Sequence, residues 1–456
     1  MPESSFLHAI WSAVGGDPAL LSAVTSHQAG ALPSVFAVSD LAAASIGAAG
    51  LAVAELISLR TNNIPAVHVD RRLASFWFSS SLRPQGWALP PAWDDIAGDY
   101  QTNDGWIRLH TNAPHHRNAA LTVLAALANK KAITQTVSKW SGDALESAIV
   151  AQGGCAAVMR SQAEWAEHPQ GLAVAAEPLL SVTMTEAGPK PAWACPAERP
   201  LQGIRVLDLT RILAGPVATR FLAGFGADVL RIDPPLWEEP GTVPEVTLGK
   251  RRARLDLRTV SDREKLVDLL KAADVMVHGF RPDALARLGL DAQMRRVINP
   301  LLVDVCLDAY GWSGPWQGRR GFDSLLQMSC GIADAGMQRL HRKEPTPLPV
   351  QALDHATGYI MAAAAIRGLV HRLSSGAGCE IRASLARTAL QLMSNEDPQT
   401  ESAAFGTETA ADCGTWPEAT DWGAARRLRS PVDVENTPMQ WRYPAGKLGT
   451  DRAVWA

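Results

Sequence analysis

An aspartate at the start of an alanine-rich segment is the first candidate for chemistry in this sequence. Asp354 follows the short stretch PVQAL, and the proline-free run from Asp354 to about His371 predicts a helix. A carboxylate at this end of a helix faces the positive end of the dipole, so we expect it to be ionised at neutral pH. An aspartate before a helix is most often an N-cap, which is the alternative interpretation.

Two nearby residues favour a functional role for Asp354. Thr357 and Gly358 follow it within one helical turn. Glycine inside a helix costs roughly 1 kcal/mol relative to alanine, so Gly358 predicts that another backbone segment approaches the helix closely. An ionised and reachable carboxylate at such a point can act as a nucleophile.

Length, composition and charge limit the classes of protein that this chain can represent. Its 456 residues predict two or more domains, and its net charge of −3 predicts no broad basic surface for nucleic acid or membrane. The six cysteines are scattered without CxxC pairs, which predicts neither a disulfide framework nor a zinc site. The apolar run from Leu41 to Ala54 is too short to span a bilayer and predicts a packed helix. We therefore expect a cytoplasmic protein without a signal peptide.

Strand-like and helix-like segments alternate from Leu201 onward. The runs GIRVLDLT, ADVLRID, RRARLDL, DVMVHGF and PLLVDVCL predict strands, and the segments between them predict helices, which is the pattern of an α/β fold with a parallel sheet. Ligands bind at the carboxyl ends of such strands, as at Thr210 to Pro216 and Gly279 to Pro282. No GxGxxG follows the first strand, which disfavours a nicotinamide dinucleotide. The basic cluster from Lys250 to Arg258 is either a solvated edge or a contact for a phosphate-bearing ligand.

Several ordered motifs resemble the class III CoA-transferase family, also called the CaiB/BaiF family. The match begins at LQGIRVLDLTRILAGPVATRFLAGFGADVLRIDPP and runs through GKRRARLDLRT, ADVMVHGFRPDALARLGLD, NPLLVDVCLDAYGWSGPW and GFDSLL to LDHATGYIMAAAAIRGLVHR, about residues 200–395. The resemblance implies a Rossmann-like CoA-binding domain in which Asp354 is the catalytic residue. It also implies CoA contacts at Leu213, Ala214, Leu255, Arg258, Gly279, Phe280, Arg281 and Arg287.

The resemblance implies transfer of CoA from an acyl-CoA to a carboxylic acid through an aspartyl anhydride and an aspartyl thioester. Coenzyme A is then a substrate, with no tightly bound cofactor and no metal, and the protein is expected to form a homodimer. Backbone N–H groups near Gly358 or in residues 311–314 are candidate oxyanion donors. His355 is considered as a proton carrier, although a solvent-facing or interface histidine is the simpler interpretation.

Two alternative functions remain open. A non-catalytic CoA-binding relative would keep the fold without the chemistry. An acyl-CoA racemase would need a histidine in a G-H-D motif, but the corresponding residues are Gly321, Phe322 and Asp323, so racemisation is disfavoured.

The first half of the chain resembles other parts of the same family, in a different order. GDYQTNDGWIRLHTNAPHHR predicts a hairpin around Asp104-Gly105 and is similar to the family's small domain, as is GCAAVMRSQAEWAEHPQ. No ligand partner lies at metal spacing from His115 and His116. A shift of 314 residues places Asp40 on Asp354. Asp40 lacks the following Thr-Gly, so we interpret it as a cap or a relic, and the alternative is that Asp40 is the nucleophile.

The predicted organisation has three parts. Residues 1–199 form an N-terminal region that begins with helices over 1–32 and carries the second copy of the aspartate helix and the small domain. Residues 200–395 form the Rossmann-like domain, and residues 396–456 form a C-terminal tail that wraps around the others.

Overall fold

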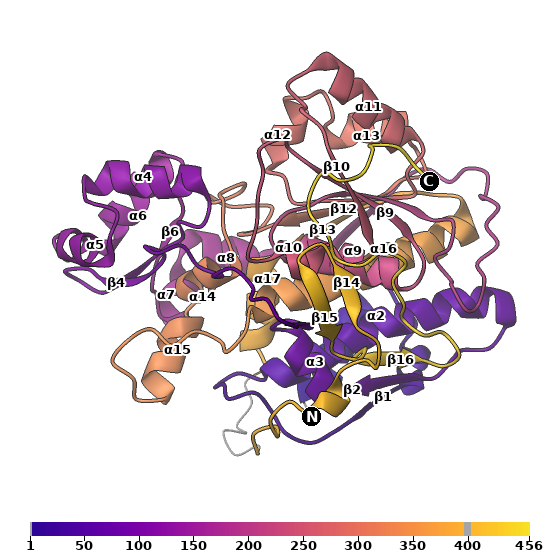
Figure 1. Cartoon of the computed structure of the whole chain (residues 1–456), viewed down its shortest axis with the longest axis horizontal. Helices are drawn as coiled ribbons and strands as arrows, with labels where there is room; N and C mark the ends of the chain where they lie inside the picture. The colour runs from indigo at the N-terminus through magenta and orange to yellow at the C-terminus, as the bar shows by residue number, and fades with distance from the viewer. Residues whose placement is uncertain (1, 396–402) are drawn as a thin grey trace.

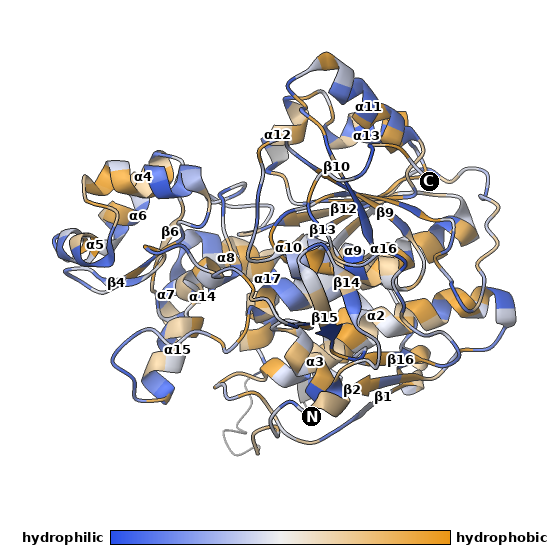
Figure 2. Ribbon diagram, viewed as in Figure 1, coloured by the Kyte–Doolittle hydropathy of each residue, from blue (hydrophilic) through white to orange (hydrophobic). Residues whose placement is uncertain are grey.

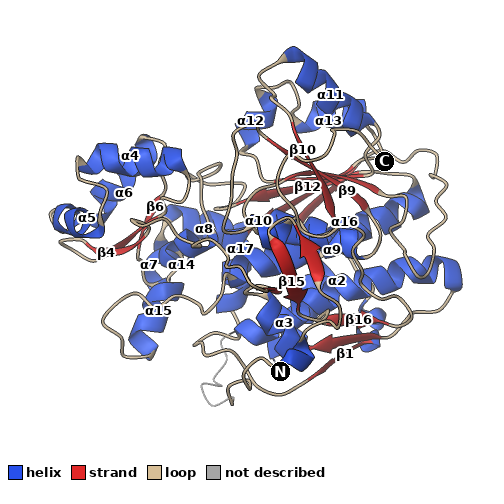
Figure 3. Cartoon of the chain, in the orientation of Figure 1, coloured by secondary structure: helices blue, strands red, loops and turns tan. Residues whose placement is uncertain are grey.

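A seven-stranded sheet lies at the centre of the computed structural model, which describes residues 2–395 and 403–456 (Figures 1 and 3). The strand order is β10-β9-β8-β11-β12-β13-β7, and every neighbouring pair is parallel except β13 and β7. The strands are β7 (Ser181–Met184), β8 (Arg205–Leu209), β9 (Asp228–Asp233), β10 (Lys250–Arg254), β11 (Val275–His278), β12 (Val303–Asp308) and β13 (Cys379–Ser384). The predicted parallel α/β architecture is confirmed.

The order of these strands creates a topological switch point. The chain passes from β8 outward to β9 and β10 and then returns to the other side of β8 to form β11, β12 and β13. The loops after β8 and β11 therefore leave the same sheet edge in opposite directions, which is where open α/β sheets bind ligands. The surrounding helices are α9 (Ala214–Gly224), α10 (Val243–Val246), α11 (Val260–Lys271), α12 (Pro282–Ala286), α13 (Ala292–Ile298), α14 (Asp323–Ser329), α15 (Ile332–Arg339), α16 (Ala352–Ser375) and α17 (Leu385–Met393).

The predicted internal repeat is present in the fold. Helix α2 (Val38–Thr61) packs along α16, and a shift of 314 residues superposes the bounds of the two helices. The same shift relates their left-handed C-caps, Asn62 and Gly376, and the side-chain N-caps Asp70 and Ser384 of the helices that follow. The two copies thus complement each other within one chain.

Helix α2 is also long and apolar enough to cross a membrane, by length and composition alone. However, 89% of its most apolar window is buried inside the fold. Buried residues occur on all sides of α2 and α16, and the hydropathy colours show apolar residues throughout this central layer (Figure 2). The predicted packed helix over residues 41–54 is confirmed.

A smaller lobe projects from one side of the sheet (Figure 1). It contains the antiparallel strands β4 (Gly98–Gln101), β5 (Trp106–Leu109) and β6 (Ala156–Val158), which confirms the predicted hairpin. Its helices are α4 (Pro114–Leu124), α5 (Lys130–Val137) and α6 (Gly142–Ala151), and α7 (Gln162–Glu167) and α8 (Pro169–Ala176) connect it to the sheet. Apolar residues such as Ile107 and Leu145 give this lobe its own core.

The two ends of the chain pack together around α2. The expected helices over residues 1–32 are only partly right, because α1 (Pro2–Ala13) and the 3-10 turn η1 (Pro18–Ala23) are followed by strand β1 (Val24–His27). This strand is mostly exposed and lacks an apolar alternation, so only its pairing with β2 (Val67–Asp70) defines it. The remaining elements are α3 (Arg71–Trp77), β3 (Leu82–Pro84), η2 (Ala410–Asp412), β14 (Glu418–Thr420), β15 (Gly423–Arg427) and β16 (Val432–Val434).

Strand pairing joins the three predicted parts of the chain across both predicted domain boundaries. Strand β7 comes from the first segment but completes the central sheet, and β16 from the tail pairs with β2. The boundary at residue 396 lies outside the described residues, and the three-part division stays a prediction.

Candidate active site

A cavity of about 390 Å³ opens at the switch point, at the carboxyl ends of β8 and β11. One wall comes from the loop after β8, including Thr210 and Ala214, and another from Gly279 to Arg281 after β11. Asp354 lies in the lining of the same cavity. A second cavity, of about 620 Å³, lies between the small lobe and the loop around Trp237, and His115, Ile212, Trp237 and Phe322 line both. The two cavities therefore adjoin at these residues.

Asp354 is not an N-cap. It is the third residue of α16, after the cap position Gln351, whose side chain makes no capping hydrogen bond. The backbone N–H of Asp354 instead donates to Oδ2 of Asp323 at 2.9 Å. Because Asp323 supplies the capping carboxylate, the side chain of Asp354 is left to line the cavity, with 7% of the residue exposed.

The surroundings of Asp354 act on its pKa in the direction opposite to the one expected from the helix dipole. Burial raises the pKa of Asp354 well above its ordinary value, and the neighbouring Asp323 carboxyl raises it further. A backbone hydrogen bond from Ala214 opposes this effect only in part. Burial also raises the pKa of Asp323. The two carboxyls compete for one negative charge, because each disfavours ionisation of the other.

The predicted close approach at Gly358 is confirmed. A Cβ atom added there would lie 2.5 Å from the carbonyl oxygen of Ala214 and 2.8 Å from Cβ of Val217. Helices α16 and α9 therefore pack backbone against backbone one turn beyond Asp354. This contact sets the distance between Asp354 and the N-terminus of α9.

We expect Gly358→Ala to separate these helices. The added methyl group has no room beside the Ala214 carbonyl, and overpacking of this kind typically costs about 1–3 kcal/mol. Thermal unfolding should show lower stability, and activity per folded molecule should fall because Ala214 moves away from Asp354. Gly368→Ala is the control within the same helix, since its added methyl would meet side chains of Val303 and Cys379 and lies far from the cavity. Equal loss of specific activity in both variants would contradict this expectation.

The loop between β8 and α9 is held in a strained conformation. Ile212 has a φ of 63°, a region that β-branched residues rarely adopt. Its backbone N–H donates to Oε1 of Glu239 at 2.9 Å, and Glu239 also accepts from Arg231 at 3.0 Å and from Trp237 at 2.7 Å. Such strain persists only where the surroundings over-determine the conformation, and it is concentrated at functional sites.

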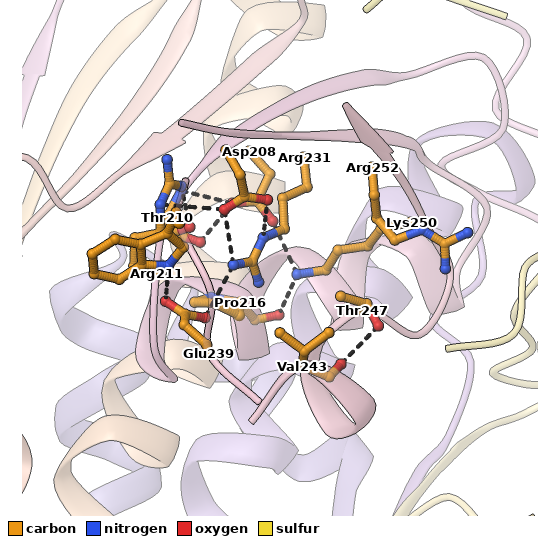
Figure 4. Close-up of polar contacts among 12 residues, drawn as sticks. Asp208, Thr210, Arg211, Pro216, Arg231, Glu239, Val243, Thr247, Lys250 and Arg252 are labelled. Atoms are coloured by element: carbon orange, nitrogen blue, oxygen red, sulfur yellow. Dashed lines mark hydrogen bonds and ion pairs between the residues drawn. The ribbon is translucent and has the colours of Figure 1, made fainter. Parts of the chain in front are cut away.

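A buried network of charged side chains also holds the loop between β8 and α9 in place. Asp208, Arg231 and Lys250 converge from three adjacent strands (Figure 4). Nζ of Lys250 donates to Asp208 at 2.9 Å and to the carbonyl of Pro216 at 3.0 Å. Asp208 in turn accepts from the backbone N–H of Thr210 at 2.9 Å. Both ends of the loop that carries Ala214 are therefore fixed to one ion pair.

The ionisation of this pair follows from its burial and its partners. Burial raises the pKa of Asp208, but Lys250 and Arg231 outweigh this effect and hold the pKa below its ordinary value. Burial lowers the pKa of Lys250 to about 8, and Asp208 opposes that shift. At neutral pH the pair is therefore charged.

The residues expected to contact CoA separate into two groups. Ala214, Gly279, Phe280 and Arg281 line the cavity together with Asp354, and Leu213 is the N-cap position of α9 directly beside it. The other three lie outside this lining: Leu255 is buried in the core beneath α11, and Arg258 and Arg287 pair on the surface with Asp256 and Asp283. Their predicted contacts with CoA stay predictions.

Two further candidates from the sequence, Asp40 and His355, make contacts away from this cavity. Asp40 is bound by both terminal nitrogens of Arg71, at 2.7 and 2.9 Å, as expected for a structural residue. His355 is fully buried and stacks on Phe78, so the solvent-facing interpretation was wrong; burial lowers its pKa to about 3. Neither residue lines the cavity that holds Asp354.

A buried group of possible metal ligands lies away from Asp354. His278, Asp304 and Cys306 bring one ligand atom each within 4.8 Å of one another. However, Arg295 lies 2.6 Å from Asp304 and already supplies the positive charge that this carboxylate needs. The group is explained as part of the packing beneath α13.

The small lobe contributes cavity residues that the sequence did not single out for this site. His115 and His116 line the cavity, and Phe322 stacks on His110 with ring centroids 3.8 Å apart. Burial lowers the pKa of His110 and of His116 to about 3, so both rings are neutral. The paired histidines were visible in the sequence, but only the docking of the lobe brings them to Asp354.

The oxyanion donors expected from the sequence are also revised. In residues 311–314, the N–H of Gly311 is directed to Asp308 and that of Trp312 to Glu177. Residue Gly358 faces the Ala214 carbonyl rather than the cavity. The backbone group beside Asp354 is that of Ala214.

Part of this chain is similar to known CoA-transferases. Residues 201–413 match the model of CoA-transferase family III. A probable fatty acyl-CoA transferase of Mycobacterium tuberculosis is 32% identical over 212 residues, which cover 43% of this chain and 53% of the relative. An acyl-CoA transferase of Gibberella moniliformis is 26% identical over 435 residues, or 83% of this chain and 75% of the relative.

One solved relative is the crystal structure of a CaiB/BaiF family protein from Brucella suis. It is 26% identical, covers 50% of this chain and 65% of that chain, and has a TM-score of 0.39. The similarity to CoA-transferase family III covers somewhat less than half of this chain. The chain spans about half the length of several curated relatives that it matches over this segment.

Proposed function

We propose that this protein transfers CoA from an acyl-CoA to a carboxylic acid and that Asp354 is the covalent nucleophile. The observation that carries the proposal is the position of Asp354, which lines the switch-point cavity together with Ala214 and with Gly279 to Arg281. A carboxylate in that position can reach a thioester held across the carboxyl edge of the sheet.

The proposed reaction conserves charge and needs no external proton. The Asp354 carboxylate attacks the thioester carbonyl, the C–S bond breaks, and the products are an aspartyl anhydride and CoA thiolate. The thiolate attacks the aspartyl carbonyl, which releases the donor acid and leaves an aspartyl-CoA thioester. The acceptor carboxylate then attacks the aspartyl-CoA thioester, which releases CoA thiolate and forms a second aspartyl anhydride. The thiolate attacks the acceptor's carbonyl carbon in this anhydride, so the acceptor leaves as its CoA thioester and the Asp354 carboxylate is restored. One difficult exchange is thereby divided into several easier ones.

The electrostatics of the cavity support this sequence of steps. Its lining contains four arginines, at positions 211, 281, 319 and 320, and two aspartates, Asp308 and Asp354. Burial raises the pKa of Asp308 to about 7. Arginine is well suited to phosphate and carboxylate groups, which CoA and both acids supply. The Ala214 N–H is the donor that we assign to the developing oxyanion.

The test is a mass-spectrometric screen of acyl-CoA and carboxylic acid pairs. Transfer predicts a new acyl-CoA and the free donor acid in equal amounts, only when both substrates are present. A racemase would exchange the Cα proton for deuterium without an acceptor acid, and a non-catalytic relative would bind CoA without either reaction. The phenylalanine at position 322 disfavours the racemase. The same preparations analysed by light scattering test the expected homodimer.

We expect Asp323→Asn to move the acidic limb of the pH–rate profile to lower pH. Only ionised Asp354 is nucleophilic, so activity rises as pH rises through its pKa. Removing the Asp323 charge removes the second-largest cause of the raised pKa of Asp354, so the rise should begin at a lower pH.

The measurement is kcat/KM against pH, with Asp334→Asn as the control. Asp334 lies on neighbouring α15, and burial also raises its pKa, but it makes no contact with Asp354. An acidic limb that stays in place in Asp323→Asn would exclude the coupling between the two carboxyls.

A further inference from the structure

We propose that Glu239 is a positioning residue: it holds Ile212 in a left-handed backbone conformation and thereby keeps the Ala214 N–H beside Asp354. This inference rests on the proposed function, because the Ala214 N–H is the donor assigned there to the developing oxyanion. Glu239 lies in the loop between β9 and α10 and lines the second cavity, next to the one that contains Asp354.

Both carboxylate oxygens of Glu239 are bound by the protein itself. Oε1 accepts from the backbone N–H of Ile212 at 2.9 Å and from Nε1 of Trp237 at 2.7 Å. Oε2 accepts from Arg231 at 3.0 Å (Figure 4). Only 7% of the residue is exposed, and hydrogen bonds to an ionised group are roughly twice as strong as neutral ones. The carboxylate is therefore suited to hold a backbone group in place rather than to act as a base.

Glu239 is itself fixed within the fold. Its carbonyl accepts from the backbone N–H groups of Thr242 and Val243, at 3.0 and 2.9 Å, where α10 begins. Its partner Arg231 is fully buried and also donates to Asp233, at 2.9 and 3.1 Å. The Glu239 carboxylate therefore has a fixed position from which it can restrain the loop between β8 and α9.

The conformation of Ile212 determines how the chain enters α9. Its φ of 63° lies in the left-handed region, whereas β-branched residues strongly prefer a negative φ. Leu213, the only residue between Ile212 and Ala214, occupies the N-cap position without a side-chain capping bond. A change of φ at Ile212 to a negative value would therefore redirect the peptide groups that lead to Ala214, including the N–H assigned to the oxyanion.

The test is a double-mutant cycle that relieves the strain at position 212. Glu239→Ala should lower kcat about tenfold to 100-fold and leave the KM for acyl-CoA within about twofold, because a donor that acts in the transition state affects kcat. Glycine adopts a positive φ without strain, so Glu239→Ala should lower kcat less than about threefold when Ile212→Gly is already present. Ile212→Val keeps the branched side chain, so the full loss should remain in that background.

A conservative variant and a matched control accompany the cycle. Glu239→Gln should lose less activity than Glu239→Ala, because its amide oxygen can still accept from the Ile212 N–H. It replaces Glu239→Ala in the cycle if that variant does not fold. Glu418 also accepts from a backbone N–H, that of Ala445 at 2.7 Å, and from Arg427 at 2.8 Å, but it lines neither cavity. Glu418→Ala should lower stability without lowering kcat per folded molecule.

Amide hydrogen exchange of residues 210–214 gives a readout that needs no turnover. Glu239→Ala should speed this exchange at least about tenfold, and Glu418→Ala should leave it unchanged. The proposal is overturned if exchange in Glu239→Ala equals that of the parent, if kcat falls by the same factor in the Ile212→Gly and Ile212→Val backgrounds, or if only KM changes. Faster exchange in Glu239→Ala, with a parent that moves no CoA, would reject the proposed function and keep the restraint of the loop by Glu239.

Discussion

Replacing Asp354 by asparagine should lower CoA transfer by at least about 1,000-fold, because an amide cannot act as the carboxylate nucleophile that we assign to this residue. Asparagine has nearly the same shape as aspartate, so the cavity and its CoA contacts should persist. Burial raises the pKa of this carboxyl, which means that its ionisation at neutral pH costs folding free energy. The variant should therefore be at least as stable as the parent at neutral pH.

The sign of this effect follows from proton linkage. A carboxyl whose pKa is raised by folding stabilises the native state at low pH, and this contribution is lost as pH rises through the folded pKa. Asp354→Asn should therefore gain stability relative to the parent at high pH and lose that advantage at acidic pH. Thermal unfolding of both proteins across pH tests this directly.

Asp40→Asn is the matched control, because Asp40 occupies the same position in the other copy of the helix. It should lower stability by about 1.5–3 kcal/mol, since it breaks the paired hydrogen bonds with Arg71. Its activity per folded molecule should stay within twofold of the parent. Loss of turnover in Asp40→Asn together with full activity in Asp354→Asn would show that the nucleophile lies on α2 and not on α16.

Lys250→Met should produce the largest loss of stability, about 3–5 kcal/mol. Lys250 and Asp208 are both fully buried, so removing the lysine deprives a carboxylate in the core of its directly paired cation. The Pro216 carbonyl also loses the hydrogen bond that it accepts from Nζ. Because the same ion pair fixes the loop that carries Ala214, activity should fall with stability. Urea unfolding and the transfer assay measure the two effects.

Adding Asp208→Asn to Lys250→Met tests whether the loss of stability comes from the unpaired Asp208 charge or from the loss of the lysine side chain itself. The double variant removes both buried charges, and asparagine can still accept from Thr210, so we expect it to be more stable than Lys250→Met alone. Lys265→Met is the surface control, since its pair with Asp262 is exposed and should contribute less than about 0.5 kcal/mol. A double variant less stable than Lys250→Met would contradict the role assigned to the pair.

The features that the sequence predicts best are those with local causes. The parallel sheet follows from strands that alternate with helices, and the α2 and α16 repeat follows from a constant shift between Asp40 and Asp354. The sequence predicts a close contact at Gly358 because glycine inside a helix is unfavourable without one, and the Ala214 carbonyl makes that contact. In each case the sequence signal lies within one segment, although the contact that it predicts is made with another element.

The features that it misses depend on contacts between distant segments. The ionisation of Asp354 was predicted from its own helix, but burial and Asp323 determine its pKa. The wall made by His115 and His116 exists only because the small lobe docks on the sheet. Strand β1 was missed because its partner β2, rather than its own residues, makes it a strand. These are consequences of tertiary packing, which residue types alone do not specify.

The covalent step can be trapped at a single residue. When an acyl-CoA is added without an acceptor acid and the mixture is treated with hydroxylamine, the account predicts a hydroxamate on the peptide that contains Asp354, found by mass spectrometry. Asp354→Asn should give no such peptide, and Asp40→Asn should give as much as the parent. An unmodified Asp354 in protein that still moves CoA between acids would contradict nucleophilic catalysis by this carboxyl.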